Sequence, residues 1–169
     1  MKKQHNSVEK MWQSYIESID ESIQSLDKTY EAWHFCMDEK NANELAELVR
    51  KGVKRGTTSL YYSYQLENEP LPKVGQYNII TNWAGVAQCI IKTVGVEITS
   101  FNNVTEAFAQ IEGEGDGSLD YWKRVHKIAF EKELVSTEKE FSEEMLVVCE
   151  IFKVVYPKLD SEGKPNFKV

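Results

Sequence analysis

The segment Gly52-Val-Lys-Arg-Gly-Thr57 concentrates side chains that could do chemistry. It sets the amine of Lys54 and the hydroxyl of Thr57 three residues apart, and its two glycines permit close approach of a backbone to a ligand. A lysine that loses its water in a cleft can titrate near neutrality and act as a base toward a hydroxyl or a water. A structural interpretation stands beside this one: Gly52 ends a helix, Lys54 interacts with its last carbonyl groups, and Thr57 begins the next element.

A second group of candidates lies in the acidic segment that starts at Glu112. Glu112, Glu114 and Asp116 alternate with glycine, as in the opening of a calcium loop. The twelfth position counted from Glu112 is Lys123, where an EF-hand requires a glutamate, so an EF-hand is excluded. A looser magnesium site and a solvated loop with one inward carboxylate remain as alternatives. We expect no cofactor and no resident metal.

Two tryptophans, a histidine and an arginine are further candidates for ligand contact. His126 lies one turn after Trp122 on an expected helix, where it serves either as a core residue or as a ligand contact. Trp83, near an expected hairpin turn, could stack on a base or shield the core. Arg55 belongs to the basic cluster of residues 50–55, which could hold a phosphate or form a solvated helix end.

The elements that must position these residues form an α+β pattern. Apolar residues at helical spacing, together with capping residues, predict helices at residues 7–26, from near 41 to 52, and at 59–67, 104–111 and 118–130. Alternating and β-branched runs predict strands at residues 76–81, 86–98 and 145–156, the first two as an antiparallel hairpin. Residues 30–37 fit a strand or a helix end, and 157–169 form a polar tail.

Length and composition limit the class of protein. The chain has 169 residues, enough for about one domain with its own core, and 27 acidic against 20 basic residues give a net charge of -7. The chain is therefore not coated with basic charge, although a small local nucleic-acid site stays possible. Cys36, Cys89 and Cys149 form no CxxC pair, so we expect three core thiols rather than disulfides or a zinc site. With no signal peptide and no long apolar run, we expect a cytoplasmic protein.

The segment 52–57 resembles the GxKxxT signature of the ASCH domain, with matches at Gly52, Lys54 and Thr57. Further segments resemble longer bacterial ASCH proteins: residues 67–75, residues 108–116, Trp122 with His126, and the closing strand at 145–152. The resemblance covers roughly residues 33–157. We accordingly expect a helical extension at 1–29, an ASCH domain at 30–157 and the tail at 158–169.

The resemblance implies a small antiparallel or mixed β-barrel of PUA-like type, surrounded by helices, with a cleft at the GxKxxT loop. The superfamily is associated with RNA, and some small members resemble amidohydrolases that act on acylated cytidine with a lysine, a threonine and a glutamate. Carried over, this implies Lys54, Thr57 and Glu112 as catalytic residues. The ligand-binding candidates are Gly52, Arg55, Trp83, Glu114, Asp116, Trp122 and His126.

The hydrolytic hypothesis contains a conflict. Lys54 would deprotonate Thr57 or a water, and Glu112 would either protonate the leaving amine or pair with Lys54. Pairing would raise the pKa of the lysine and suppress the base. The expected partner is RNA or a small nucleotide-like ligand, with neither a membrane nor long duplex DNA. A non-catalytic RNA-binding module and a ribonuclease are the alternatives.

Overall fold

The computed structural model describes residues 4–19, 29–159 and 165–166. Its main sheet has five strands in the order β1-β3-β4-β5-β2. β1 and β3 pair in parallel, and the other neighbours are antiparallel. The bounds are β1 Tyr30–Trp33, β2 Gly56–Leu60, β3 Tyr77–Thr81, β4 Ala87–Ser100 and β5 Leu146–Tyr156. A separate two-stranded sheet pairs β6 Lys158–Leu159 with β7 Pro165–Asn166.

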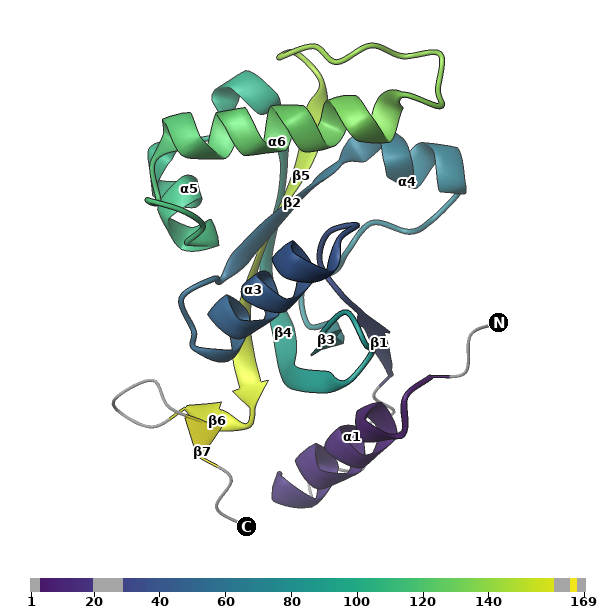
Figure 1. Cartoon of the computed structure of the whole chain (residues 1–169), viewed down its shortest axis with the longest axis vertical. Helices are drawn as coiled ribbons and strands as arrows, with labels where there is room; N and C mark the ends of the chain where they lie inside the picture. The colour runs from purple at the N-terminus through teal and green to yellow at the C-terminus, as the bar shows by residue number, and fades with distance from the viewer. Residues whose placement is uncertain (1–3, 20–28, 160–164, 167–169) are drawn as a thin grey trace.

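Helices pack around this sheet. Figure 1 shows α6 across one end of the sheet, α3 over its middle and α1 near the opposite end. The helical elements are α1 Asn6–Ser18, α3 Glu39–Arg50, α4 Tyr61–Glu67, the 3-10 turn Phe101–Asn103, α5 Glu106–Glu112 and α6 Leu119–Leu134. The α+β class predicted from the sequence is therefore confirmed.

The expected barrel is not closed. Within the described strands, β1 and β2 are the two edges of an open sheet and do not pair with each other. The register shifts twice where β4 meets β5, at Ile90/Ile91 and at Thr93/Gly95. Such irregularities bend a strand and increase its twist, which curves the sheet without joining its edges.

Several boundaries differ from those predicted. Residues 56–60 form β2, which the sequence analysis missed, and the helix expected from residue 59 begins at Tyr61. α3 starts at Glu39 because Asp38 Oδ1 accepts a hydrogen bond from the Asn41 amide at 2.9 Å. The first helix is described to Ser18, and residues 20–26 of its predicted range lie outside the described residues. Two short strands follow β5, which was expected to be the last.

The core has three parts. Trp122 of α6 packs against Phe101, Trp12 of α1 packs against Tyr77 of β3, and Phe152 packs against α3. Two of the three thiols lie in the core as expected, but Cys36 is exposed and has a φ of 56° in the turn before α3. The prediction of a third core thiol was therefore wrong.

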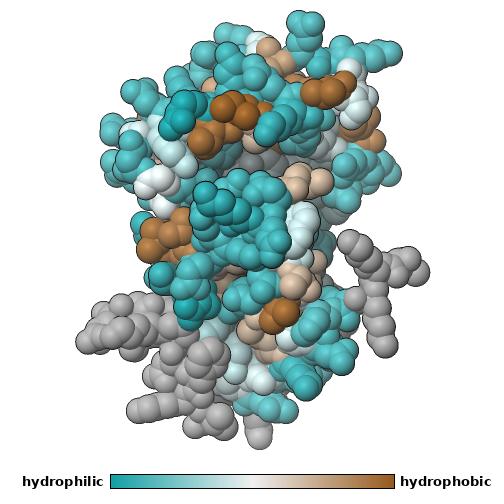
Figure 2. Space-filling model, viewed as in Figure 1, coloured by the Kyte–Doolittle hydropathy of each residue, from teal (hydrophilic) through white to brown (hydrophobic). Residues whose placement is uncertain are grey.

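The face seen in Figure 2 is mainly hydrophilic, with apolar residues in small separate patches. Scattered apolar side chains are normal on a protein surface and indicate no interface by themselves. Among the residues that the structure places, no helix combines the length and the hydropathy needed to cross a membrane.

Candidate ligand-binding site

The turn after α3 directs the GxKxxT segment. Gly52 has a φ of 71°, and the amides of Val53 and Lys54 both donate to the Leu48 carbonyl, at 2.9 and 3.1 Å. A positive φ is accessible to glycine at little cost, so Gly52 lets the chain reverse at this point. The backbone of Arg55 is then held on both sides, by the Ile111 carbonyl and the Phe152 amide.

Lys54 points into the protein. Its side chain is 1% exposed, and its Nζ donates to Glu112 Oε2 at 2.9 Å and to Glu114 Oε1 at 2.5 Å. The ring of Phe35 lies 5.2 Å from the same nitrogen. The ammonium is thus enclosed by two carboxylates and an aromatic face.

Glu112 is saturated with donors. Its Oε1 accepts hydrogen bonds from Thr58 Oγ1 at 2.5 Å and from Trp122 Nε1 at 2.8 Å, and His126 Nε2 lies 3.5 Å away. The rings of Trp122 and His126 stack with their centroids 4.3 Å apart. We call the six residues Lys54, Thr58, Glu112, Glu114, Trp122 and His126 the Lys54 cluster.

Both charges of the central pair are stabilised. Burial alone would lower the pKa of Lys54, but the neighbouring charges of Glu112 and Glu114 raise it above its ordinary value. Burial would raise the pKa of Glu112, but Lys54, His126 and the donated hydrogen bonds lower it to about 2. At neutral pH the cluster therefore holds an ammonium and a carboxylate, and Lys54 has no free electron pair with which to act as a base.

Thr57 faces the other way. Successive side chains of a strand point to opposite faces. In β2, Thr58 turns toward Glu112, and Thr57 is paired in register with Glu150 of β5 and lines a hollow. The structure thus brings Lys54 and Glu112 together and separates Thr57 from them. The proposed common site of these three residues is not formed.

The remaining predicted ligand residues divide between the cluster and the surface. Glu114, Trp122 and His126 join the Lys54 cluster. Asp116 is exposed and accepts hydrogen bonds from the amide and hydroxyl of Ser118 before α6. Trp83 is 40% exposed in the β3–β4 turn.

The predicted basic cluster is mostly engaged. Arg50 and Lys51 contact Glu47 at 2.6 and 3.3 Å, and Lys54 is buried. Only Arg55 of this group is exposed without an ion pair in the described chain. A multidentate phosphate site at residues 50–55 is not formed.

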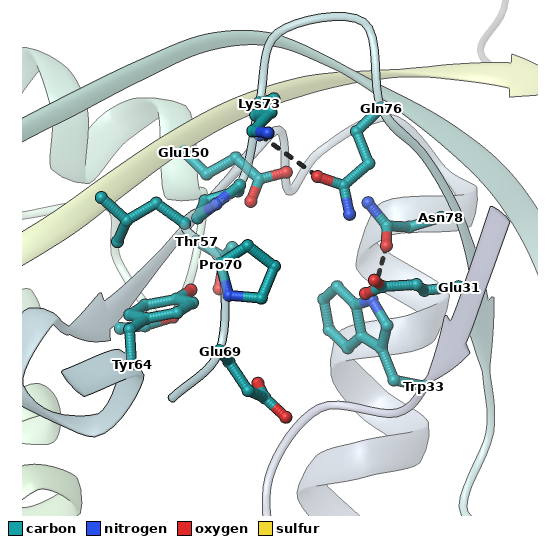
Figure 3. Close-up of a pocket in the computed structure, with 13 residues that line it drawn as sticks. Glu31, Trp33, Thr57, Tyr64, Glu69, Pro70, Lys73, Gln76, Asn78 and Glu150 are labelled. Atoms are coloured by element: carbon teal, nitrogen blue, oxygen red, sulfur yellow. Dashed lines mark hydrogen bonds between the residues drawn. The ribbon is translucent and has the colours of Figure 1, made fainter. Parts of the chain in front are cut away.

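The hollow beside Thr57 has a volume of about 590 Å³ and is lined largely by polar side chains. Figure 3 shows side chains from β1, β2, β3 and β5 converging on it, with the segment 69–73 alongside. We call it the Thr57 pocket. Its lining residues are Glu31, Trp33, Thr57, Ser59, Tyr64, Glu69, Pro70, Leu71, Pro72, Lys73, Gln76, Asn78 and Glu150.

Two amides in the Thr57 pocket are oriented by neighbours. Trp33 Nε1 donates to Asn78 Oδ1 at 3.0 Å, and the Lys73 amide donates to Gln76 Oε1 at 3.1 Å. Since both carbonyl oxygens are engaged, the amide nitrogens are the groups left to donate, and Figure 3 shows them facing the hollow. The pocket therefore presents a pair of hydrogen-bond donors.

Glu150 supplies an acceptor. It is 7% exposed, and its Oε1 accepts a hydrogen bond from Thr93 Oγ1 at 2.6 Å. Burial raises the pKa of Glu150, and the nearby charge of Glu31 adds to that rise, against the hydrogen bond from Thr93.

The sequence analysis missed Trp33, Tyr64, Gln76, Asn78 and Glu150 as site residues. A signal was present for two of them. Asn78 and Glu150 are single polar residues inside apolar strands, in Tyr-Asn-Ile-Ile-Thr and in Val-Cys-Glu-Ile-Phe. A buried polar group in a strand needs a partner, so such a residue marks either a buried network or a site.

The model of the ASCH domain family matches residues 31–156. This chain belongs to the ASCH domain family. It is similar to the crystal structure of an ASCH domain from Lactobacillus crispatus JV V101, with 38% identity, a TM-score of 0.86, and coverage of 92% of this chain and 98% of that one. A crystal structure of a protein from Enterococcus faecalis V583 is similar at 38% identity and a TM-score of 0.78, with 88% of each chain covered. No curated protein matches the chain.

In this ASCH domain the residues of the GxKxxT motif therefore lie in two different environments. Its lysine enters a closed, charge-balanced cluster, and its threonine lines an open pocket. Within the described residues, no group of three or more His, Cys, Asp or Glu side chains is arranged to hold a metal ion.

Proposed function

We propose that this ASCH domain binds RNA or a nucleotide-like ligand by seating a nucleobase in the Thr57 pocket. The PUA-like ASCH fold supports a function of the RNA-binding type. One observation supports the assignment to this pocket. The same hollow contains the aromatic rings of Trp33 and Tyr64, the amide donors of Gln76 and Asn78, and the carboxylate of Glu150.

These groups match the chemistry of a nucleobase. A base offers a flat ring for stacking, worth about 1–3 kcal/mol per base on an aromatic side chain. Its edge carries donors and acceptors that complement amide and carboxylate groups. A volume of about 590 Å³ lies within the usual range for small-ligand sites.

The geometry favours binding over hydrolysis by Lys54, Thr57 and Glu112. Lys54 and Glu112 are each 1% exposed and form an ion pair with each other, so neither side chain is available to contact a ligand. Thr57 stands alone among the three in the pocket. Hydrolysis can be tested by incubating the protein with N-acylated cytidine and analysing the products by mass spectrometry. We expect no turnover that depends on Lys54 as a base.

A binding assay tests the proposal. Nucleosides, nucleotides and short single-stranded RNA are titrated into the protein by calorimetry. Trp33→Leu and Tyr64→Leu should each weaken binding by about tenfold or more, as expected for loss of one stacking contact. Trp83→Leu is the matched control, because it removes an exposed ring outside the pocket.

The salt dependence of binding separates a base pocket from a phosphate-binding surface. Several phosphate contacts would give a steep decrease in affinity with salt, whereas a seated base gives a shallow one. Binding that survives both pocket substitutions, or that fails only with Trp83→Leu, would contradict the assignment to the Thr57 pocket.

A further inference from the structure

The Thr57 pocket is acidic. Three of its lining residues, Glu31, Glu69 and Glu150, carry carboxylates, and Lys73 is its one lining cation, a formal balance of two negative charges. Such a lining repels a phosphate and attracts a cation. The part of the ligand that enters this pocket is therefore not its anionic part.

Glu150 has an oxygen open to the hollow. Its Oε1 is engaged by Thr93, and its Oε2 accepts no hydrogen bond from the described residues. Across the described chain, every side-chain nitrogen or oxygen shut off from solvent has a partner, so Oε2 is not shut off. Figure 3 shows this carboxylate turned toward the interior of the pocket.

The charge of Glu150 is poorly compensated by the protein. Burial raises the pKa of this carboxyl, and Glu31 raises it further by repulsion. Lys73 is exposed, and its backbone amide rather than its ammonium makes the contact at the pocket. A positive charge brought in by the ligand would neutralise this carboxylate, for which the described residues provide no ion pair.

The aromatic rings favour the same kind of ligand. Trp33 and Tyr64 both line the pocket, and the faces of tryptophan and tyrosine attract a cation within about 6 Å. Aromatic faces together with carboxylates stabilise a flat cationic ring more than a neutral one of the same shape. They also replace part of the water that the cation loses on entry.

Resting on the proposed nucleobase pocket, we infer that the Thr57 pocket selects a positively charged nucleobase, such as one alkylated on a ring nitrogen, over a neutral one. The ring is held by Trp33 and Tyr64, its charge by Glu150 and Glu31, and its acceptor atoms by the amides of Gln76 and Asn78. Such a base could reach the pocket as a free nucleoside or within a single strand of RNA.

Two positional isomers compare a charged base with a neutral one. 1-Methyladenosine is protonated and cationic at neutral pH, whereas N6-methyladenosine carries its methyl group on the exocyclic nitrogen and is neutral. Each is titrated by calorimetry as the nucleoside and within one short single-stranded RNA, with adenosine as the parent. We expect the 1-methyl form to bind tighter than the N6-methyl form by on the order of tenfold. The preference should appear with the free nucleosides if the natural ligand is a nucleoside, and with the RNA if it is a base within a single strand.

Charge-neutral variants locate the preference. Glu150→Gln and Glu31→Gln should each reduce the ratio of the two affinities, with the larger reduction for Glu150. Glu97→Gln is the control, because it removes one negative charge at an exposed position outside the pocket, and it should leave the ratio unchanged.

The outcomes separate the two claims. Equal affinity for the isomers, or tighter binding of the neutral one, overturns the selection of a cation; if that binding is still lost in Trp33→Leu, the nucleobase pocket stands. If no nucleoside or RNA binds, both claims fail. If Glu97→Gln lowers the ratio as much as Glu150→Gln, the preference reflects overall charge and the inference is wrong.

Discussion

Lys54 and Glu112 lie 58 residues apart in the chain and form a buried ion pair, with Nζ 2.9 Å from Oε2. The pair joins the turn after α3 to the last residue of α5. Through Thr58, which donates to the same carboxylate, it also holds β2. The motif lysine thus acts as a structural support for the strand on which Thr57 stands.

Replacing Lys54 by methionine should destabilise the fold. The substitution leaves Glu112 buried without its main counter-charge, which typically costs about 3–5 kcal/mol. Chemical denaturation measures the change in the free energy of unfolding. The double variant Lys54→Met with Glu112→Gln should recover part of the loss, since the fully buried Glu112 no longer carries a charge and the remaining carboxylate, Glu114, is partly exposed. A stable Lys54→Met protein would show that the ion pair does not support the fold.

Acid should weaken the fold through Glu112. Its pKa is lowered from 4.5 to about 2 in the folded protein, so its contribution is complete above the ordinary value and is lost as the pH falls toward 2. The shift corresponds to on the order of 3 kcal/mol. Glu112→Gln should flatten the dependence of the unfolding free energy on pH between about 4.5 and 2. An unchanged slope in that window would contradict the assignment.

Thr57 and Thr58 offer a matched pair of substitutions. Thr58→Val removes a donor to the buried Glu112 carboxylate and should lower stability by about 1–3 kcal/mol, with nucleobase affinity retained in the folded protein. Thr57→Val should weaken nucleobase binding and leave stability largely unchanged, because Thr57 lines the pocket whereas Thr58 donates to Glu112. Thermal unfolding and calorimetric titration of both variants provide the two readouts. The same effect on both readouts from both variants would mean that the two faces are not independent.

Gly113→Ala should destabilise the Lys54 cluster by displacing the backbone beside Lys54. Gly113 has a φ of 65°, and a Cβ added there would lie 2.5 Å from the Val53 carbonyl oxygen. The left-handed conformation and the clash together should cost about 2 kcal/mol or more. Gly117→Ala is the control, because its φ is also positive but nothing lies within 4 Å of its Cβ. A larger loss of thermal stability for Gly117→Ala would contradict this explanation.

Local patterns in the sequence predicted most of the elements. The hairpin of β3 and β4 follows from alternating β-branched residues, and Ser118 caps α6 as expected by accepting from the Tyr121 amide. β2 was missed because Gly-Thr-Thr-Ser-Leu carries little apolar signal and becomes a strand by pairing with β5. Such tertiary contributions override local propensity.

The site was harder to predict than the elements. The meeting of Lys54 with Glu112 was anticipated through the family resemblance, and the pairing alternative already implied a lysine unable to act as a base. A cleft at the GxKxxT loop was expected, but most of the lining of the Thr57 pocket was not anticipated, because Trp33, Gln76 and Glu150 come from three distant segments. Only the sheet order places them together.

The Thr57 pocket is lined by residues from both edges of the open sheet. Trp33 belongs to β1 and Thr57 to β2, the two outermost strands of the sheet. A ligand that contacts both residues would link two edge strands that share no backbone hydrogen bonds with each other. Occupancy of the pocket would then slow amide exchange in both edge strands at once, so exchange at β1 and β2 would report whether the pocket is filled.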